Sequence, residues 1–208
     1  MSAASSVNDF SRVMVANRGE IAIRAFRACT ELGKRTVAVY SDEDSLSLHR
    51  YKADEAYLLS SELGPVEAYL DIDGIVSLAV EKDIDAIYPG YGFLAENAGF
   101  AAAVEAAGII WVGPSPEVIS SMGDKLAAKK AAVAAGVPTL PSSDDPTADD
   151  EVGYPILVKA AAGGGGKGMH LVERPEDLAE AVATAQREAA SSFGDDRVFL
   201  ERYVARSR

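Results

Sequence analysis

The stretch KAAAGGGGKGMHLV, residues 159–172, places four consecutive glycines between two lysines and follows them with an apolar run. Glycines leave the backbone bare, so its N–H groups can approach phosphate oxygens, and lysines add positive charge beside them. The flanking runs, PILVKA (155–160) and MHLV (169–172), have the composition of strands. The stretch therefore predicts a glycine-rich β-hairpin that closes over phosphates, with a ligand-free surface hairpin as the alternative.

Two other kinds of phosphate-binding loop fit the letters but not the context. Gly163, Gly165 and Gly168 match G-x-G-x-x-G, yet a dinucleotide-binding loop needs a helix to begin there, and a strand-like run follows instead. A P-loop needs Ser or Thr after its lysine to hold Mg²⁺, whereas Gly168 follows Lys167. A nucleotide-binding lid is the interpretation that remains.

The segments around the hairpin predict an α+β layer at residues 123–208. MGDKLAAKKAAVAAG (122–136) predicts one helix, and the polar, acidic run PSSDDPTADDE (141–151) predicts an exposed connection. After the hairpin, the pattern predicts a helix over residues 175–190 and a strand at RVFLE (197–201).

The first part of the chain predicts an open parallel sheet. The runs RVMVA and TVAVY, within residues 12–40, frame a helix and predict a β-α-β unit. Two further helix–strand rounds follow, IDGIVSLAVEKD with DAIYP and ENAGFAAAVEAAG with IIWV. This alternation predicts a Rossmann-like α/β domain at residues 12–122, after a loose tail at 1–11, with ligand loops at the carboxyl ends of its strands. The buried stripe of the first helix is predicted to be Ile21, Ala25, Ala28, Cys29 and Leu32.

Charge and composition exclude several classes of protein. The chain of 208 residues has a formal net charge of -12 and scattered Lys and Arg, which excludes a nucleic-acid or anionic-membrane surface. No apolar run approaches the ~18 to 20 residues of a membrane span, and no secretory signal opens the chain. The single Cys29 excludes an internal disulfide, and His49 and His170 lack neighbours at zinc-ligand spacing. We expect a soluble, cytoplasmic protein.

The chain contains five segments that together carry a family resemblance: VANRGEIAIRAFRACTELG (15–33), YPGYGFLAEN (88–97), GPSPEVISSMGDKLAAKK (113–130), GYPILVKAAAGGGGKGM (153–169) and FLERYV (199–204). In order and approximate spacing they resemble the start of the biotin carboxylase component of biotin-dependent carboxylases. KADEAYLL and GPVEAYLDI favour the pyruvate carboxylase branch over the acetyl- and propionyl-CoA carboxylase subunits. The resemblance covers nearly the whole chain and implies an α/β domain followed by the first part of an ATP-grasp domain, truncated.

The resemblance implies an ATP-dependent ligase that requires Mg²⁺ or Mn²⁺. In this family ATP phosphorylates bicarbonate, and the carboxyphosphate breaks down to CO₂, which carboxylates biotin on a carrier domain. The implied partners are bicarbonate, a biotin carboxyl carrier domain, a carboxyltransferase, and a second copy bound through the helix face of Arg27 and Glu31. The simpler interpretation of that face is a solvated stripe with an internal ion pair of about 0.2 to 0.5 kcal/mol.

The resemblance also implies the site residues. Lys125 and Lys159 match the lysines that contact ATP, and Tyr91 and Gly92 match a loop near the biotin ring. No catalytic or metal-binding residue is expected in this chain. The lid over the nucleotide matches Gly163, Gly164, Gly165, Gly166, Lys167, Gly168 and Met169, with Ala162 where the family usually has another glycine. The hinge that contacts adenine matches Glu201, Arg202, Tyr203 and Val204.

Two departures from the family pattern and three alternatives remain at this point. The connection 141–153 is shorter than usual, and the chain stops at Arg208, before the second ATP-grasp lobe, so we expect a fragment that is inactive alone. The alternatives are another ATP-grasp ligase, such as a carbamoyl-phosphate synthetase or a purine-pathway carboxylase, a non-catalytic nucleotide-binding module, and an NAD-binding domain.

Overall fold

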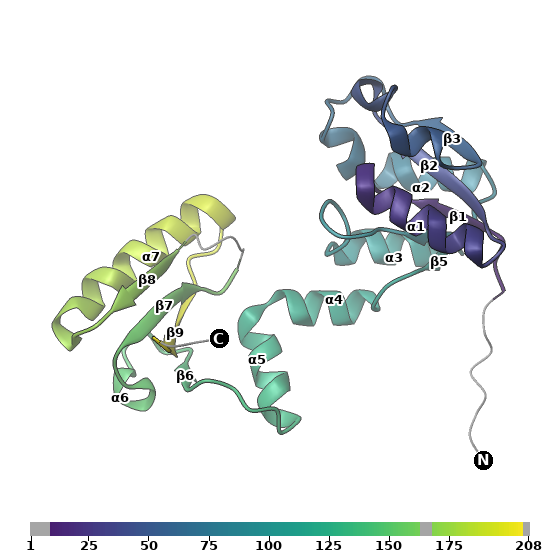
Figure 1. Cartoon of the computed structure of the whole chain (residues 1–208). Helices are drawn as coiled ribbons and strands as arrows, with labels where there is room; N and C mark the ends of the chain where they lie inside the picture. Colours follow the sequence, from purple (N-terminus) through teal and green to yellow (C-terminus); the bar gives the residue numbers. More distant parts are fainter. Residues whose placement is uncertain (1–8, 163–167, 206–208) are drawn as a thin grey trace, which may run out of the picture. The chain divides into compact units, whose positions relative to one another are not determined.

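The computed structural model describes residues 9–162 and 168–205. The chain forms two compact units, Met1–Ser120 and Ser121–Arg208 (Figure 1). Each unit has its own sheet and its own buried core.

The first unit contains a five-stranded sheet in the order β3-β2-β1-β4-β5, and every neighbouring pair is parallel. The open parallel sheet predicted from the strand–helix alternation is therefore confirmed. The sheet also contains the edge strand β3, which the sequence pattern did not predict. The strands are β1 (Arg12–Val15), β2 (Arg35–Tyr40), β3 (Glu55–Leu58), β4 (Ala86–Tyr88) and β5 (Ile110–Trp111). The helices are α1 (Gly19–Glu31), α2 (Ile72–Glu81) and α3 (Ala98–Ala106), with 3-10 turns η1 (Asp42–Asp44), η2 (Leu48–Tyr51) and η3 (Glu67–Leu70).

Alternate residues of the central strands pack on opposite faces of this sheet. Met14 and Val37 belong to the core that contains Ile75 of α2 and Phe100 of α3. Their neighbour Val15 belongs to a separate cluster with residues of α1. Both faces of the inner strands are therefore apolar, which explains why these strands appear in the sequence as continuous apolar runs.

The predicted buried stripe of α1 is wrong. Ala22 and Phe26 are the buried residues of this helix, whereas Leu32 is 74% exposed and Cys29 is only half-buried. The helix carries two apolar stripes, and helical spacing alone does not tell which one the sheet will cover. The predicted stripe instead lines a cavity of about 400 Å³, together with Phe10, Val13, Tyr88, Tyr91 and Val112.

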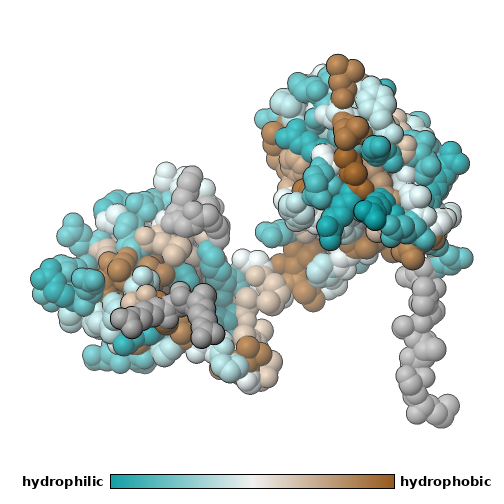
Figure 2. Space-filling model, viewed as in Figure 1, coloured by the Kyte–Doolittle hydropathy of each residue, from teal (hydrophilic) through white to brown (hydrophobic). Residues whose placement is uncertain are grey.

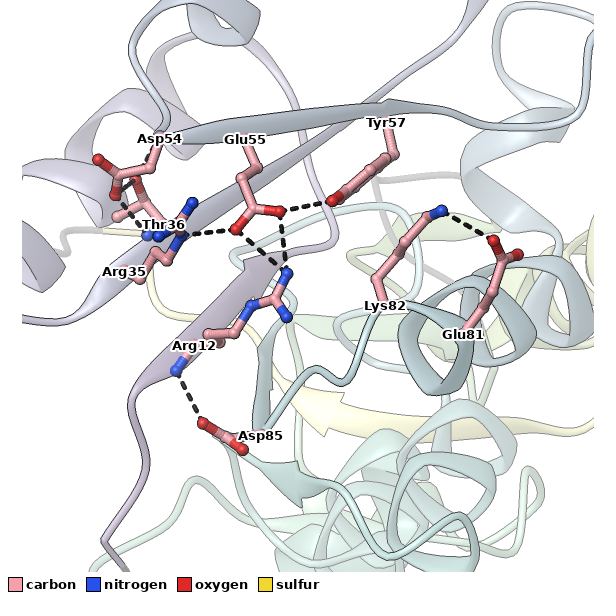
Figure 3. Close-up of polar contacts among 9 residues, drawn as sticks. All are labelled: Arg12, Arg35, Thr36, Asp54, Glu55, Tyr57, Glu81, Lys82 and Asp85. Atoms are coloured by element: carbon pink, nitrogen blue, oxygen red, sulfur yellow. Dashed lines mark hydrogen bonds and ion pairs between the residues drawn. The ribbon is translucent and has the colours of Figure 1, made fainter.

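A carboxylate network attaches the edge strand β3 to the sheet (Figure 3). Glu55 accepts hydrogen bonds from the guanidinium groups of Arg12 on β1 and Arg35 on β2, and from the Tyr57 hydroxyl. The Tyr57 hydrogen bond, together with the two arginines, holds the pKa of Glu55 below its ordinary value. These contacts fix a strand of only four residues, which is too short to give a clear pattern in the sequence.

The second unit contains a four-stranded antiparallel sheet in the order β6-β9-β7-β8. Its strands are β6 (Ser142–Ser143), β7 (Ile156–Ala160), β8 (Met169–Val172) and β9 (Val198–Arg202). Its helices are α5 (Lys125–Ala134), α6 (Asp149–Val152), η4 (Pro175–Asp177) and α7 (Leu178–Phe193), and α4 (Pro116–Gly123) precedes them.

Two local predictions in this unit are corrected. The single helix predicted over 122–136 is two helices, because Asp124 leaves the helical conformation and its side chain accepts from the N–H groups of Leu126 and Ala127 as the N-cap of α5. The connection predicted over 141–151 contains β6, which pairs with β9, and most of α6, whose last residue Val152 is buried. The shortened connection thus still supplies an edge strand and a core residue.

Helix α7 covers one face of the second sheet (Figure 1), where Ile156, Val158, Val172 and Leu200 form the core with residues of that helix. Residues that face each other across antiparallel strands lie on the same side of a sheet. The alternate residues of β7, β8 and β9 therefore share the other face. They are Leu157, Lys159, Met169, Leu171, Phe199 and Glu201.

Both units present a mixed surface, and Figure 2 shows apolar patches among hydrophilic residues on the visible face of each. The exposed large side chains of the first unit include Leu46, Leu48 and Tyr51 around η2. Among the described residues, no helix is long and apolar enough to cross a bilayer.

Candidate nucleotide site

The glycine-rich stretch forms the predicted hairpin. Lys159 of β7 lies opposite Met169 of β8, and the Ala160 N–H donates to the Gly168 carbonyl at 3.1 Å. Gly168 has a φ of 68°, which favours glycine, and β8 begins at the next residue. The hairpin prediction is confirmed, and the helix that an NAD-binding loop would need is absent from the described residues here. Gly163, Gly164, Gly165, Gly166 and Lys167 lie outside the described residues.

Lys125 lies at the base of this hairpin. The Asp124 cap fixes the start of α5, so that Lys125 occupies its first turn. Its ammonium group donates to the carbonyls of Ala160 at 3.1 Å and Ala162 at 3.3 Å. Burial lowers the pKa of Lys125, and the nearby charge of Lys159 lowers it further. The two lysines matched to ATP contacts therefore bring their charges close enough to interact.

Glu201 is bound by two lysines, one on each carboxylate oxygen. Lys159 donates to Oε1 at 2.6 Å and Lys129 to Oε2 at 2.7 Å. The side chains of Glu201, Lys129 and Lys159 are 16%, 14% and 24% exposed. Burial alone would raise the pKa of Glu201, but the two lysine hydrogen bonds outweigh it and the pKa lies below its ordinary value.

Lys129 is a site residue that sequence reasoning missed. The sequence placed it in the helix predicted over residues 122–136, with no specific role. A usable signal was present, because Lys129 follows Lys125 by four residues, and positions i and i+4 lie on the same face of a helix. The adjacent Lys130 lies on another face and pairs instead with the exposed Asp144.

The main-chain N–H groups of the predicted hinge differ in their partners. The Arg202 N–H donates to the Pro141 carbonyl and the Tyr203 N–H to the Pro155 carbonyl, both at 2.9 Å. Within the described residues the Val204 N–H donates to no group, and Val204 is half-exposed. Of the matched hinge residues, Glu201 and Val204 therefore offer polar groups to a ligand.

Apolar side chains surround these charges on the same face of the sheet. Leu157 lies opposite both Leu171 and Glu201 in the strand register, and Met169 lies opposite Lys159. Met169 and Leu171 are both partly exposed, and the Lys159 ammonium lies 5.8 Å from the centre of the Phe199 ring. The face thus combines an apolar surface, a hinge with a carboxylate and an N–H, and ammonium groups at the hairpin base. This combination suits a flat heteroaromatic base linked to phosphates.

The described residues contain no group of three His, Cys, Asp or Glu side chains that could hold a metal ion. The donor set at the hairpin consists of ammonium groups and carbonyls with one carboxylate, so it does not fit Mg²⁺ or Mn²⁺.

Tyr91 and Gly92 belong to the first unit, in the loop after β4. Asn17, at the end of β1, donates from its amide to the carbonyls of Pro89 at 2.8 Å and Tyr91 at 3.0 Å. A Cβ on Gly90 would lie 2.5 Å from the Ile21 methyl group, so this loop packs directly on α1. The segments ANRG and PGYG, which are far apart in the sequence, therefore contact each other directly. The role of Asn17 in positioning the second segment was not predicted. The Tyr91 side chain is 65% exposed.

Arg27 and Glu31 form the ion pair that their spacing predicts. The Arg27 Nε lies 3.0 Å from Glu31 Oε1, and both side chains are largely exposed on α1. Such a pair contributes little stability by itself.

The chain matches two protein families over consecutive parts. Residues 9–119 match the family described as "Biotin carboxylase, N-terminal domain", and residues 124–208 match "Carbamoyl-phosphate synthase L chain, ATP binding domain". It is 52% identical over 208 residues to pyruvate carboxylase 1 of Caenorhabditis elegans and 50% identical over 207 residues to pyruvate carboxylase of Bacillus subtilis. Each alignment covers 96% of this chain and 18% of the relative. The chain thus spans less than a fifth of the length of these relatives.

Solved structures agree with this assignment. The biotin carboxylase domain dimer of Hydrogenobacter thermophilus 2-oxoglutarate carboxylase, in complex with MgADP, ADP and bicarbonate, has a TM-score of 0.86 and 45% identity, over 94% of this chain and 45% of that one. The Campylobacter jejuni biotin carboxylase–β-γ-ATP complex also has a TM-score of 0.86, with 40% identity over 94% of this chain and 46% of that one. Because the biotin carboxylase N-terminal domain family matches more than half of this chain, the chain belongs to the biotin carboxylase family.

Proposed function

We propose that the second unit binds the adenine nucleotide of an ATP-dependent biotin carboxylase of the pyruvate carboxylase type. The observation that carries this proposal is the convergence of Lys125, Lys159 and Glu201 on the hairpin and the open face of its sheet. ATP would supply the phosphoryl group that activates bicarbonate. The H. thermophilus domain in complex with MgADP and bicarbonate supports this choice of ligand.

Lys125 and Lys159 are the residues that would hold the phosphates. Their ammonium groups lie at the base of the glycine hairpin and each is partly withdrawn from water, so their charges act through a medium of lower polarity than bulk water. Fixed positive charge at that position stabilises negative charge on a phosphate chain.

Glu201 and Val204 are the residues that would select adenine. A carboxylate accepts a hydrogen bond from the exocyclic amine, and a main-chain N–H donates to a ring nitrogen. Leu157 and Met169, on the same face of the sheet, would pack on the base. A guanine or hypoxanthine base presents a carbonyl where adenine presents the amine, and Glu201 would repel it.

The remaining roles concern biotin, the metal and the partners. Tyr91 and Gly92 are proposed to lie near the biotin of a carrier domain, since Asn17 holds their loop in one conformation at the carboxyl end of β4. The H. thermophilus relative is a domain dimer, and we propose that the exposed Arg27–Glu31 face of α1 takes part in a similar pairing. The described residues do not fit Mg²⁺ or Mn²⁺, so no metal-dependent step is assigned to them.

Nucleotide binding is tested by titrating the ¹⁵N-labelled 208-residue chain with ADP. We expect saturable shifts of amide resonances in β7, β8 and the residues around Val204, and we expect Lys159→Ala to weaken binding about tenfold or more, since a lost charged hydrogen bond costs about 1.5–3 kcal/mol. Shifts that appear equally with NAD, or that survive Lys159→Ala unchanged, would contradict the proposal.

Turnover is a separate expectation. Because the described residues lack a metal cage, the 208-residue chain should show no bicarbonate-dependent ATP hydrolysis above that of the Lys159→Ala variant. A phosphate-release assay with and without bicarbonate measures this directly, and hydrolysis above the variant would show that these residues complete a catalytic site.

A further inference from the structure

Lys129 contacts the carboxylate that would select adenine, but it belongs to neither the hairpin nor the hinge. We propose that Lys129 is a positioning residue that holds Glu201 in place for the adenine amine when Lys159 leaves it for the nucleotide phosphates. This inference rests on the proposed nucleotide site and adds to it a residue that neither the sequence motifs nor the resemblance assigns.

The proposal requires Lys159 to change its partner when a nucleotide binds. Its ammonium group donates to Glu201 at 2.6 Å, on the side of the site that would hold adenine. The base and the phosphates lie at opposite ends of a nucleotide, and a phosphate at the hairpin would draw Lys159 away from Glu201 by its larger negative charge. The carboxylate, only 16% exposed, then depends on its remaining partner.

Lys129 is the partner that would remain on Glu201. Its side chain is 14% exposed, against 24% for Lys159, and among the described residues Glu201 is its only acceptor. Its helix is fixed at the first turn by the Asp124 cap and by the contacts of Lys125 with the carbonyls of Ala160 and Ala162. Lys129 and Glu201 therefore contact each other from a helix and a strand, whereas Lys159 is more exposed and lies beside the hairpin, one residue before the end of β7.

The charges in the site support the same division of roles. Two ammonium groups, those of Lys129 and Lys159, contact one carboxylate, and the charge of Lys125 lies close enough to that of Lys159 to interact with it. Without Lys129, the departure of Lys159 would leave a mostly buried carboxylate with no cation, which is strongly unfavourable. Lys159 would then stay on Glu201, and both the phosphate contact and the base contact would weaken together.

The chain offers a matched control on the same helix. Lys130 is 72% exposed and pairs with Asp144, which is also exposed. Lys129→Met and Lys130→Met remove the same charge one residue apart, so a difference between them reports the contact with Glu201 and not the net charge. Lys129→Arg restores a cation and serves as the conservative variant.

The experiment measures ADP and inosine diphosphate affinities of the full 208-residue chain by NMR titration. Lys129→Met is expected to weaken ADP binding by about tenfold, since a buried charged group left unpaired costs about 1–3 kcal/mol, and to reduce the preference for ADP over inosine diphosphate. Lys130→Met should stay within about twofold of the unmodified chain, because an exposed pair contributes little. Lys129→Arg should recover most of the preference.

A second measurement needs no nucleotide. The ¹³C shift of the Glu201 carboxyl group, followed against pH, should show a higher pKa in Lys129→Met and no change in Lys130→Met. An unchanged Glu201 titration, or an unchanged preference for ADP over inosine diphosphate in Lys129→Met, would overturn the role of Lys129 even where ADP binds. Absence of saturable ADP binding by the unmodified chain would instead overturn the proposed nucleotide site, and with it the nucleotide-dependent part of this inference.

Discussion

Replacing Asn17 by aspartate is expected to destabilise the first unit by about 3 kcal/mol or more, since it places a charge in a buried position with no cationic partner. The Asn17 side chain is 1% exposed. Its amide donates to the carbonyls of Pro89 and Tyr91, and its oxygen accepts from the Arg18 N–H at 2.9 Å. An aspartate would keep the last contact and face the two carbonyls with a carboxylate oxygen.

One effect opposes this loss but is too small to cancel it. Asn17 stands just before α1, and a negative charge near a helix N-terminus gains about 0.3–1 kcal/mol. The loss of two donors and the burial of an unpaired charge exceed that gain. The loop that holds Tyr91 and Gly92 should therefore separate from β1, with new amide resonances for both residues.

Chemical denaturation followed by amide exchange in β1 and β4 measures this prediction in the first unit. Asn97→Asp is the matched control. Among the described residues the Asn97 side chain makes one hydrogen bond, as acceptor from the Phe100 N–H at 2.9 Å at the start of α3, and aspartate caps a helix equally well. Equal stabilities of the two variants would mean that the Asn17 amide does not hold the loop.

The sequence predicted the elements of this fold better than their contacts. The alternation of apolar strands and helices identified the parallel sheet, because inner strands covered on both faces are continuously apolar. Strand β3 was not predicted, because its apolar run is short and the ion pairs of Glu55 that attach it to β1 and β2 join residues far apart in the sequence. The prediction of which side of α1 is buried was wrong, because Phe26 and Leu32 both satisfy an apolar helical pattern. Packing against the sheet determines which of the two is buried.

The candidate site could also be predicted only in part from the sequence. The glycine hairpin followed from strand-like runs on both sides of the glycines, and the roles of Lys125, Lys159 and Glu201 came from the family resemblance. Neither source identified Lys129 or Asn17. Both act through groups far away in the sequence, 72 positions for Lys129 to Glu201 and 74 for Asn17 to Tyr91, and local patterns contain no information about such contacts.

Replacing Glu201 by glutamine is expected to destabilise the second unit by about 2 kcal/mol at neutral pH, because charged hydrogen bonds contribute about 1.5–3 kcal/mol and two of them are weakened. The glutamine keeps the shape of the side chain but leaves Lys129 and Lys159, both mostly buried, facing a neutral amide. Lys125 adds to the repulsion, since its charge already interacts with that of Lys159. Glu188→Gln on α7 is the control, because Glu188 is half-exposed and contacts only His170 among the described residues.

The dependence of this loss on pH separates charge from packing. The pKa of Glu201 in the folded chain lies below its ordinary value of 4.5, so its ion pairs stabilise the fold fully above pH 4.5 and progressively less as the pH falls through the folded pKa. The stability difference between the unmodified chain and Glu201→Gln should therefore be constant from about pH 5 to 7 and shrink below about pH 4.5. Amide exchange in β7 and β9 provides the measurement. A difference that persists undiminished at pH 3 would mean that the shape of the side chain, and not its charge, holds the two lysines together.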